Sequence, residues 1–509
     1  MIDFRETTVE ALVARVKAKD VSARELTAAA LARIEEVNPR VNAFIAVDGE
    51  RALAEAEGID ARLARGEEVG PLAGIPIGVK DLEDAIGYVT GSSSAMHADD
   101  APSARDSVHV ARLRKAGCVV VGKTNAPEMG LKPLTDNPTF GITRNPWDLD
   151  RTPGGSSGGT SAALASGMIP LATGSDGGGS IRIPSAACGL SGMKTALGRV
   201  PAGDPRIPSW HDLSVRGPMA RRIRDVATAL DCVVGPHPHD QRSLPAPGSA
   251  WRPALDAPQR PRRVAWSSTL GYADTDGEVD AACRAVCAQL EAAGVEVVEV
   301  EKVFSADPGS VIGALVPIYM YAAVGRYLTD ELWTKLDPLV AVSAEMAGAT
   351  ASALSVLEAE AGCHNFGLEL AAVFEDVDLL LCPTMCGQLP RCQMDMTVDE
   401  MLAQFASGTD LSAAAGTIDI VSLLERLRKV EPINFPLGQI NGALVLDWTR
   451  LTQPFNMTRS PAATTCAGLT ADGLPIGLQI IGPQHGDVAV LSATAFIEDL
   501  VGFDQLAPV

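Results

Sequence analysis

Two loops rich in glycine and serine flank a segment of small residues in the first half of the chain. Residues 154–185 read GGSSGGTSAALASGMIPLATGSDGGGSIRIPS. Glycine adopts positive φ angles and allows backbone amides to approach a ligand closely. Successive amides, here those of residues 177–180, form a nest that binds an anion or the oxyanion of a tetrahedral intermediate. The stretch therefore predicts two tight turns around a short helix at 161–168, and a site built largely from backbone.

Three better-known motifs do not fit this stretch. A nucleotide P-loop requires Gly-Lys-Ser/Thr after its turn, and that sequence is absent here. A dinucleotide fingerprint requires an acidic residue about 20 residues further on, after a second strand, and the context does not provide it. The Gly-x-Ser-x-Gly elbow fails because Arg182 occupies the second glycine position, and none of the seven histidines lies in a recognisable triad context.

Helical patterns alternate with short apolar runs along the chain. The first 70 residues predict helices, one of which begins with a capping box at Ser22 and Glu25. Such alternation predicts an α/β fold in which helices cover a sheet. A strand at 71–79 is expected to carry Lys80 at its end. The further expected elements are helices at 106–116 and 278–294 and strands at 118–121, 295–300 and 377–381.

Two regions lack a clear period. Residues 200–260 are rich in proline and charge and predict an inserted loop region. Residues 385–450 mix proline, glycine, aspartate and methionine, and predict loops or helices over the site.

The formal net charge of −21 excludes some partners. An acidic chain repels phosphate backbones, so no nucleic-acid partner is expected. The N-terminus lacks a basic start followed by an apolar core, and the longest apolar run, 311–324, is too short to span a bilayer. The sequence therefore predicts a soluble, cytoplasmic protein with no membrane partner.

The ten cysteines are expected to be free thiols, because no secretory signal is visible. Cys382, Cys386 and Cys392 lie close together in the chain. They lack the spacing and the fourth ligand of a zinc site. Neither a metal nor a cofactor is expected.

The glycine- and serine-rich stretch resembles the pattern of the amidase signature family. Residues 154–159 match its Gly-Gly-Ser-Ser/Gly-Gly half, and 176–184 match Asp-x-Gly-x-Ser-Ile-Arg-x-Pro, with Ser156 and Ser180 separated by 24 positions. The resemblance spans about residues 5–500 and is weakest between 240 and 450. Four further segments carry it: GIPIGVKD at 74–81, GKTNAPE at 122–128, NPWD at 145–148 and GLPIGLQ at 473–479.

The resemblance implies one amidase domain over residues 1–509, with a large mixed central sheet covered by helices on both faces. Its expected parts are a helical N-terminal part at 1–70, a catalytic core at 71–200 and a variable substrate-pocket region at about 300–450. A homodimer is compatible with the resemblance.

The resemblance also implies the roles of the main site residues. Ser180 attacks the carbonyl carbon, and Ser156, entered through a cis peptide bond, relays its proton to Lys80. Lys80 must be uncharged to accept a proton, and burial lowers the pKa of a lysine. The backbone amides of Gly177, Gly178, Gly179 and Ser180 are the expected oxyanion donors. The expected supporting residues are Asp176, Arg182, Ser157, Asn125 and Thr173.

The implied function is hydrolysis of carbon–nitrogen bonds in small, aryl or oligomeric amides, or in carbamates. The 176–182 context resembles the branch that contains aryl acylamidases, nylon-oligomer hydrolases and urethane-cleaving enzymes. An alternative is the glutaminase subunit of a tRNA-dependent amidotransferase, against which the divergent 300–450 region argues. A non-catalytic binding protein is disfavoured, because Lys80, Ser156 and Ser180 are all present.

Overall fold

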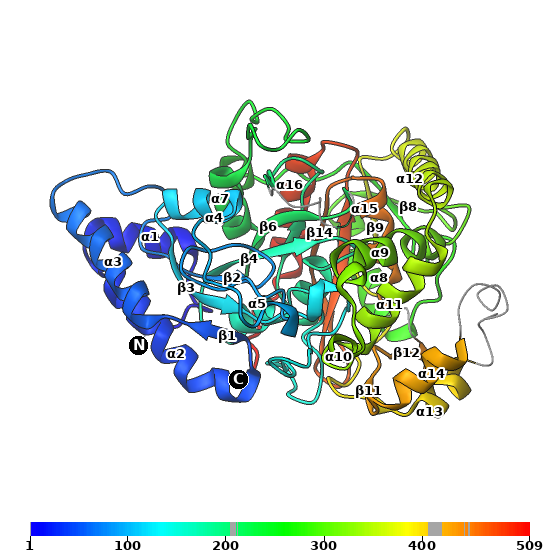
Figure 1. The fold of residues 1–509 in the computed structure, drawn as a ribbon. Coiled ribbons are helices and arrows are strands. Elements are labelled where there is room, and N and C mark those ends of the chain that lie inside the picture. Colours follow the sequence, from blue (N-terminus) through cyan, green and yellow to red (C-terminus); the bar gives the residue numbers. More distant parts are fainter. Residues whose placement is uncertain (1, 204–209, 211, 406–419, 442, 446–447) are drawn as a thin grey trace.

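The N-terminal helices form as their local signals predict. Helix α2 (Ala23–Val41) begins at Ser22, whose hydroxyl accepts from the Glu25 amide, while the Glu25 carboxylate accepts from the Ser22 amide. This reciprocal pairing satisfies two amides that the first turn leaves without partners. Helices α1 (Val9–Ala18) and α3 (Gly49–Ala64) lie beside α2 at one end of the molecule (Figure 1).

The computed structural model describes residues 2–203, 210, 212–405, 420–441, 443–445 and 448–509. Its strands form two main sheets, which adjoin where β5 contacts β6. The α/β class and the amidase-signature fold are confirmed by these elements and by the solved structures compared below.

The five-stranded sheet has the order β1-β3-β2-β4-β6. Strands β3, β2 and β4 run parallel, and the two edge strands run antiparallel to them. Parallel strands end at the same edge of a sheet, so the last residues of β2 and β4 lie close together. The strands are β1 (Phe44–Val47), β2 (Pro76–Lys80), β3 (Val119–Thr124), β4 (Leu171–Asp176) and β6 (Val215–Ala220).

The six-stranded sheet has the order β5-β14-β15-β9-β7-β8 and combines parallel with antiparallel pairs. Every residue of β2, β3, β9 and β15 is buried. Strands buried throughout have both faces covered, as in a sheet between helical layers. The strands are β5 (Gly192–Lys194), β7 (Arg263–Trp266), β8 (Glu296–Glu299), β9 (Leu379–Pro383), β14 (Ala462–Leu469) and β15 (Pro475–Ile481).

Helices α8 and α16 contact the six-stranded sheet, and α5 contacts the five-stranded sheet. Helices α9 to α12 gather at the opposite end of the molecule from α1 to α3 (Figure 1). The helices after α3 are α4 (Val108–Lys115), α5 (Gly158–Ala165), α6 (Arg182–Ala187), α7 (Ile223–Val233), α8 (Gly277–Ala292), α9 (Gly309–Ala323), α10 (Asp330–Trp333), α11 (Pro338–Thr350), α12 (Ala353–Val373), α13 (Val398–Phe405), α14 (Ile420–Arg428), α15 (Pro454–Met457) and α16 (Asp487–Val501).

Several predicted elements form with shifted ends. The strand expected at 71–79 begins only at Pro76, and the helix expected at 161–168 begins at Gly158. Gly158 and Gly159 suggest a loop in the sequence, but a Cβ on Gly159 would lie 2.5 Å from the backbone of Asn125. Glycine is therefore needed there for close packing of α5 on the end of β3, rather than for a turn.

The prediction that residues 200–260 form an inserted loop region is wrong for part of it. Residues 215–220 form strand β6, and residues 223–233 form α7. Pro218 lies within β6, where it suggested a loop. Because β6 is the edge strand of its sheet, a missing amide on the outer side leaves no ladder partner unsatisfied.

The 385–450 region contains short elements, as predicted, over the part that the structure describes. Two small hairpins, β10 (Asp395–Met396) with β11 (Ile433–Asn434) and β12 (Gly438–Ile440) with β13 (Ala443–Val445), accompany α13 and α14. Residues 406–419 lie outside the described residues.

One helical segment, Gly309–Tyr327, is long and apolar enough to cross a membrane by length and composition alone. A second candidate would be the bent pair Pro338–Gly348 and Ala353–Val373 taken as one span. Core helices pass the same test, and Val311, Leu315 and Met320 of this segment are buried within the protein.

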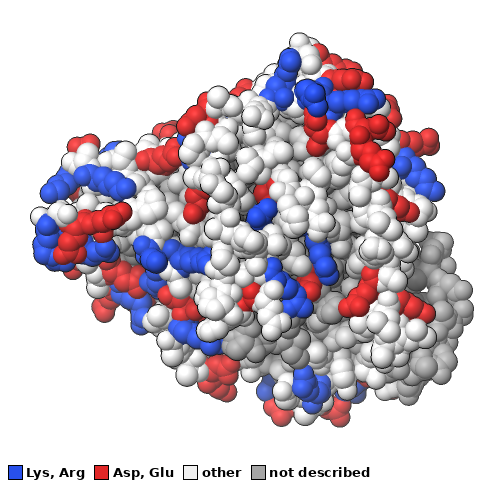
Figure 2. All heavy atoms as spheres, turned by 90° about the horizontal axis from the view of Figure 1, so that it is seen from above, with Lys and Arg blue, Asp and Glu red and all other residues white. Residues whose placement is uncertain are grey.

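Charged side chains of both signs are interspersed on the face seen from above (Figure 2). That face carries no continuous basic stripe of the kind that tracks a nucleic-acid backbone.

We predict that Leu478→Ala lowers the free energy of unfolding by about 2–5 kcal/mol, because it leaves a cavity in a packed core. Leu478 lies in β15, in the middle of the six-stranded sheet, and is 0% exposed. Leu357→Ala is the matched control: Leu357 is 61% exposed, and its truncation should cost under about 0.5 kcal/mol. Urea unfolding of the two variants measures the difference, and equal losses would contradict the assignment of the core.

Candidate active site

Lys80 ends strand β2, and its amine is enclosed by hydroxyl groups. Its side chain is 0% exposed. Its Nζ lies 2.8 Å from Ser156 Oγ, 2.9 Å from Ser157 Oγ and 3.0 Å from Ser175 Oγ. A neutral amine has two N–H donors and one lone pair, so three such contacts require one hydroxyl to donate to the nitrogen. The arrangement therefore suits an amine that accepts a proton from a serine.

The electrostatic environment of Lys80 keeps much of it uncharged near neutrality. Burial lowers the pKa of Lys80 to about 7, although the nearby charges of Glu83 and Asp176 oppose this shift. Burial alone would raise the pKa of Glu83, but His109 and Arg216 beside it lower that pKa to about 2. The two carboxylates therefore stay charged, and desolvation still dominates at the amine.

Ser156 follows a loop that only glycine can form. The peptide bond between Gly155 and Ser156 is cis, as the family resemblance implies. A Cβ on Gly155 would lie 2.8 Å from the carbonyl oxygen of Lys132 and 2.9 Å from that of Leu134. The neighbouring backbone therefore excludes any side chain at position 155. Ser156 itself is 2% exposed and faces Lys80.

Ser180 lies beside this loop and beside a cavity. Its carbonyl oxygen accepts from the Ser157 amide at 3.2 Å, which joins the two glycine-rich segments. Ser180 is half-buried and lines the cavity together with Gly155 and Gly178. The structure thus brings Lys80, Ser156, Ser157 and Ser180 to one place.

The predicted nest of four amides is reduced by one. The Gly179 amide already donates to Asp176 Oδ1 at 2.8 Å, so it is occupied. Among the described residues, the amides of Gly177, Gly178 and Ser180 donate to no protein acceptor. These three amides remain as candidate oxyanion donors.

Gly177 makes room for an aromatic ring. A Cβ at this position would lie 3.1 Å from the indole of Trp210, closer than most real contacts. Trp210 in turn lines the cavity. The family often has a bulkier residue at this position, so the glycine here allows the indole to approach the nest.

Asp176 and Arg182 form an ion pair that is wholly buried. Arg182 Nε and Nη2 lie 2.9 and 2.8 Å from the two carboxylate oxygens, and both side chains are 0% exposed. Burial alone would raise the pKa of Asp176, but Arg182, Lys194 and Asn456 hold that pKa well below its usual range. The carboxylate also accepts from the amides of Gly179 and Ile181, so it orders the backbone on both sides of Ser180.

The remaining supporting residues hold backbone in place. Thr173 Oγ1 accepts from the Lys80 amide at 3.0 Å, which fixes the end of β2. Asn125 Nδ2 donates to Thr143 Oγ1 at 3.0 Å, and Asn125 Oδ1 accepts from Asn137 at 2.8 Å. Asn125 therefore orders the 137–143 loop and is absent from the described cavity lining.

The cavity beside Ser180 measures about 340 Å³ and has mostly apolar walls. Its walls combine the signature loops with residues of α9, α11 and the 433–453 segment. The lining residues are Leu131, Lys132, Pro133, Gly155, Gly178, Ser180, Ile183, Trp210, Ile312, Gly313, Val316, Pro317, Leu339, Ser343, Phe435, Pro436, Thr449 and Gln453.

Sequence reasoning missed three residues of this site. Ser175 contacts Lys80, and it lies inside the recognised stretch, so its place next to Asp176 was a usable signal. Thr452 Oγ1 donates to the Gly178 carbonyl at 2.5 Å, and Asn456 Nδ2 donates to the Asp176 carbonyl at 2.8 Å. Both lie more than 270 residues further along the chain, where no local pattern singles them out.

Within the described ranges, no three His, Cys, Asp or Glu side chains are grouped as a metal site requires. All ten cysteines are free.

Comparison with known proteins gives the class to which this fold and site belong. An acylamidase of Rhodococcus erythropolis is 33% identical over 96% of this chain and 94% of its own length. The glutamyl-tRNA(Gln) amidotransferase subunit of Synechococcus sp. (strain CC9605) that matches this chain is 33% identical over 94% of both proteins. The class is that of hydrolases that act on amides.

Solved structures agree with this class. A bacterial aryl acylamidase of the amidase signature enzymes matches with a TM-score of 0.84 and 26% identity, over 98% of this chain and 96% of its own. A 6-aminohexanoate cyclic dimer hydrolase matches with a TM-score of 0.82 and 26% identity, over 100% and 99% of the two chains. The Amidase family model matches residues 25–439 and 426–491, and the chain belongs to the amidase family.

We predict that Arg182→Met lowers the free energy of unfolding by about 3–5 kcal/mol, because Asp176 is left as an unpaired buried charge. Arg284→Met is the matched control, since its ion pair with Glu299 is 43% and 65% exposed and should contribute about 1 kcal/mol or less. Urea unfolding measures both. A loss at Arg182 no larger than that at Arg284 would show that the buried pair does not support the loop around Ser180.

Proposed function

We propose that this chain is a free-standing amidase that cleaves carbon–nitrogen bonds through Ser180, Ser156 and Lys80. The 2.8 Å contact between the buried Lys80 amine and the Ser156 hydroxyl carries the proposal. The cavity that begins at Ser180 supports it, because a substrate carbonyl there meets both a nucleophile and free backbone amides.

The first half of the reaction forms an acyl-enzyme. Ser180 Oγ forms a bond with the carbonyl carbon and transfers its proton to Ser156 Oγ, whose own proton moves to Lys80 Nζ. The carbonyl π electrons move to the oxygen, and the resulting oxyanion is stabilised by the amides of Gly177, Gly178 and Ser180. The carbon–nitrogen bond then breaks as the proton returns from Lys80 through Ser156 to the leaving nitrogen.

The second half releases the acid. Water attacks the ester carbonyl, and its proton moves along the same two groups to Lys80. The carbon–oxygen bond to Ser180 breaks, and Ser180 regains its proton. A carbamate would follow the same path and give an alcohol, an amine and carbon dioxide.

The apolar cavity supports small amides that carry an aryl or alkyl group as substrates. The compared acylamidase, aryl acylamidase and cyclic dimer hydrolase are named for such amides. Lys132 is the one charged residue in the described lining, and it pairs with Asp136 and Asp337 at 2.8 and 2.6 Å. Its charge is therefore already compensated, which favours neutral substrates.

A second candidate is the glutaminase subunit of a tRNA-dependent amidotransferase, favoured by the 33% identity to one such protein. Glutamine carries two charged groups, and the apolar lining offers them few partners. The purified chain alone, assayed with a simple anilide and with glutamine, separates the two functions.

We further propose that the enzyme acts in the cytoplasm without a metal or cofactor, on a small-molecule substrate. A homodimer is compatible with this proposal and is tested by the mass of the purified protein in solution.

We predict that Ser180→Ala lowers kcat for amides, anilides, carbamates and esters by at least about 10⁴-fold, because it removes the nucleophile. Ser185→Ala is the matched control: this serine lies in α6, is buried, and its hydroxyl has no hydrogen-bond partner among the described atoms. Its activity should stay within a few-fold of the wild type. Turnover that survives in Ser180→Ala assigns the chemistry to another group.

We predict that kcat/KM for a neutral amide rises with pH through a midpoint near 7, where Lys80 loses its proton. Only the neutral amine accepts a proton, so about 1% of the enzyme is competent at pH 5 and kcat/KM is about 100-fold below its plateau. The same profile for Lys80→Ala, followed with an activated ester, should lack this limb. A limb that persists at the same pH in Lys80→Ala belongs to another group.

A further inference from the structure

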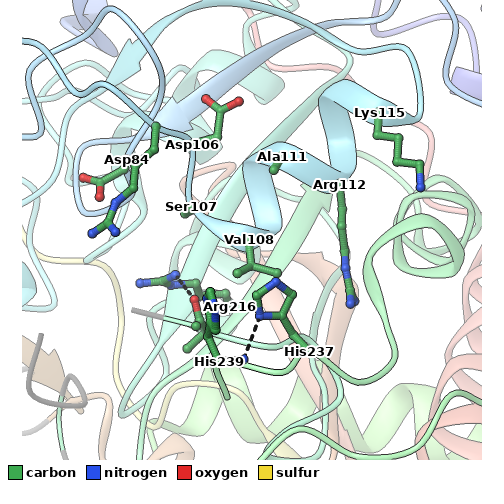
Figure 3. A pocket seen from close by; sticks show the side chains of 13 residues that line it. Asp84, Asp106, Ser107, Val108, Ala111, Arg112, Lys115, Arg216, His237 and His239 are labelled. Atoms are coloured by element: carbon green, nitrogen blue, oxygen red, sulfur yellow. Dashed lines mark hydrogen bonds between the residues drawn. The ribbon is translucent and has the colours of Figure 1, made fainter. Parts of the chain in front are cut away.

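A second cavity lies away from the catalytic one. It measures about 380 Å³ and lies between α4, strand β6 and the loop that follows α7 (Figure 3). None of its described lining residues lines the cavity beside Ser180. Its chemistry therefore calls for an explanation separate from amide hydrolysis.

The lining of this cavity is basic in a protein of net charge −21. Arg105, Arg112, Lys115 and Arg216 bring four positive charges to it from three separate parts of the chain. Figure 3 shows Arg112 and Lys115 on α4, with Arg216 across from them. Positive charge gathered from several elements in an acidic protein is typical of a site that attracts an anion.

Arg112 is held in place without being neutralised. Its guanidinium donates to the backbone carbonyls of Val233, Gly235 and Pro236 at 2.5, 3.0 and 2.7 Å. Carbonyl oxygens orient the guanidinium but carry no net charge to cancel its own. Burial lowers the pKa of Arg112 only from a value far above neutrality, so it stays charged.

Of the two carboxylates in the lining, Asp106 is engaged outside the cavity. Asp106 Oδ1 accepts from the Ile86 amide at 2.8 Å, and Oδ2 pairs with Arg114 at 3.2 Å. Arg114 is not among the described lining residues. The positive charges thus exceed the negative ones on the described walls.

His237 adds a neutral donor. Its Nδ1 accepts from the His239 amide at 3.3 Å (Figure 3), so in the neutral ring the proton resides on Nε2. Val108 and Ala111 of α4 supply apolar wall beside these polar groups. A cavity of this kind offers charge for an anion and apolar surface for the body of a molecule.

We propose that this cavity binds the phosphate group of a small phosphorylated molecule. Arginine and lysine together suit a dianion better than a single carboxylate, because guanidinium groups bind phosphate oxygens in pairs. The cavity has the size of small-molecule sites and far exceeds the volume of one phosphate ion. The shared chemistry is a phosphate group, either as the free ion or as a monoester.

Calorimetric titration at constant ionic strength tests the proposal with three probes: glycerol 2-phosphate, inorganic phosphate and glycerol with sodium chloride. We expect saturable binding of a phosphate probe and none of glycerol with chloride. Tighter binding of the monoester assigns an organic phosphate, and tighter binding of inorganic phosphate assigns the free ion. Absence of saturable binding by both phosphate probes would overturn the proposal.

The variant Arg105→Gln/Lys115→Gln removes two exposed cations of the cavity and should weaken binding at least about tenfold. Arg262→Gln/Lys335→Gln is the matched control, because it removes the same charge at side chains that are 91% and 56% exposed elsewhere. Equal weakening in both would show that general charge, and not this cavity, binds the anion. Ser180→Ala should bind like the wild type, so this test stands apart from the proposed hydrolysis.

Discussion

The structure of the site depends on placing one lysine amine where water cannot reach it. A charged amine without a carboxylate partner is costly in such a place, so the proton is held weakly and the amine is partly neutral near pH 7. Three serine hydroxyls satisfy its hydrogen-bonding capacity without adding charge. The parallel strands β2 and β4 fix its position, because both end at the edge of the sheet where the two glycine-rich segments meet.

A second buried charge, the pair of Asp176 and Arg182, ties the two halves of the molecule together. Arg182 also donates to the Thr452 carbonyl at 2.8 Å and to Gln479 Oε1 at 2.6 Å, on segments far from it in the chain. The loop around Ser180 is thereby ordered by the six-stranded sheet, while Lys80 belongs to the five-stranded sheet. Both sheets must be in place before nucleophile and base can meet.

The two cavities differ in the chemistry of their walls. One is apolar and begins at the serine cluster, and its far wall comes from α9, α11 and the 433–453 segment. The other is basic and is built by α4, β6 and the loop after α7. Relatives with different substrates share the signature with this chain, and the resemblance is weakest in the region that supplies the far wall. Differences in that wall therefore give a physical basis for different substrates on one catalytic core.

The sequence by itself determined the α/β class, the family, and the local grouping of Ser156, Ser180 and Asp176, because these depend on short-range spacing and on glycine where backbone packs closely. It also indicated that Lys80 ends a strand. Only the tertiary structure decided that Ser175 contacts the amine, that the Gly179 amide is occupied, and that Thr452 and Asn456 hold the nest. Pairings between residues hundreds of positions apart leave no local period, and the exposure that sets the pKa of Lys80 exists only once both sheets are packed.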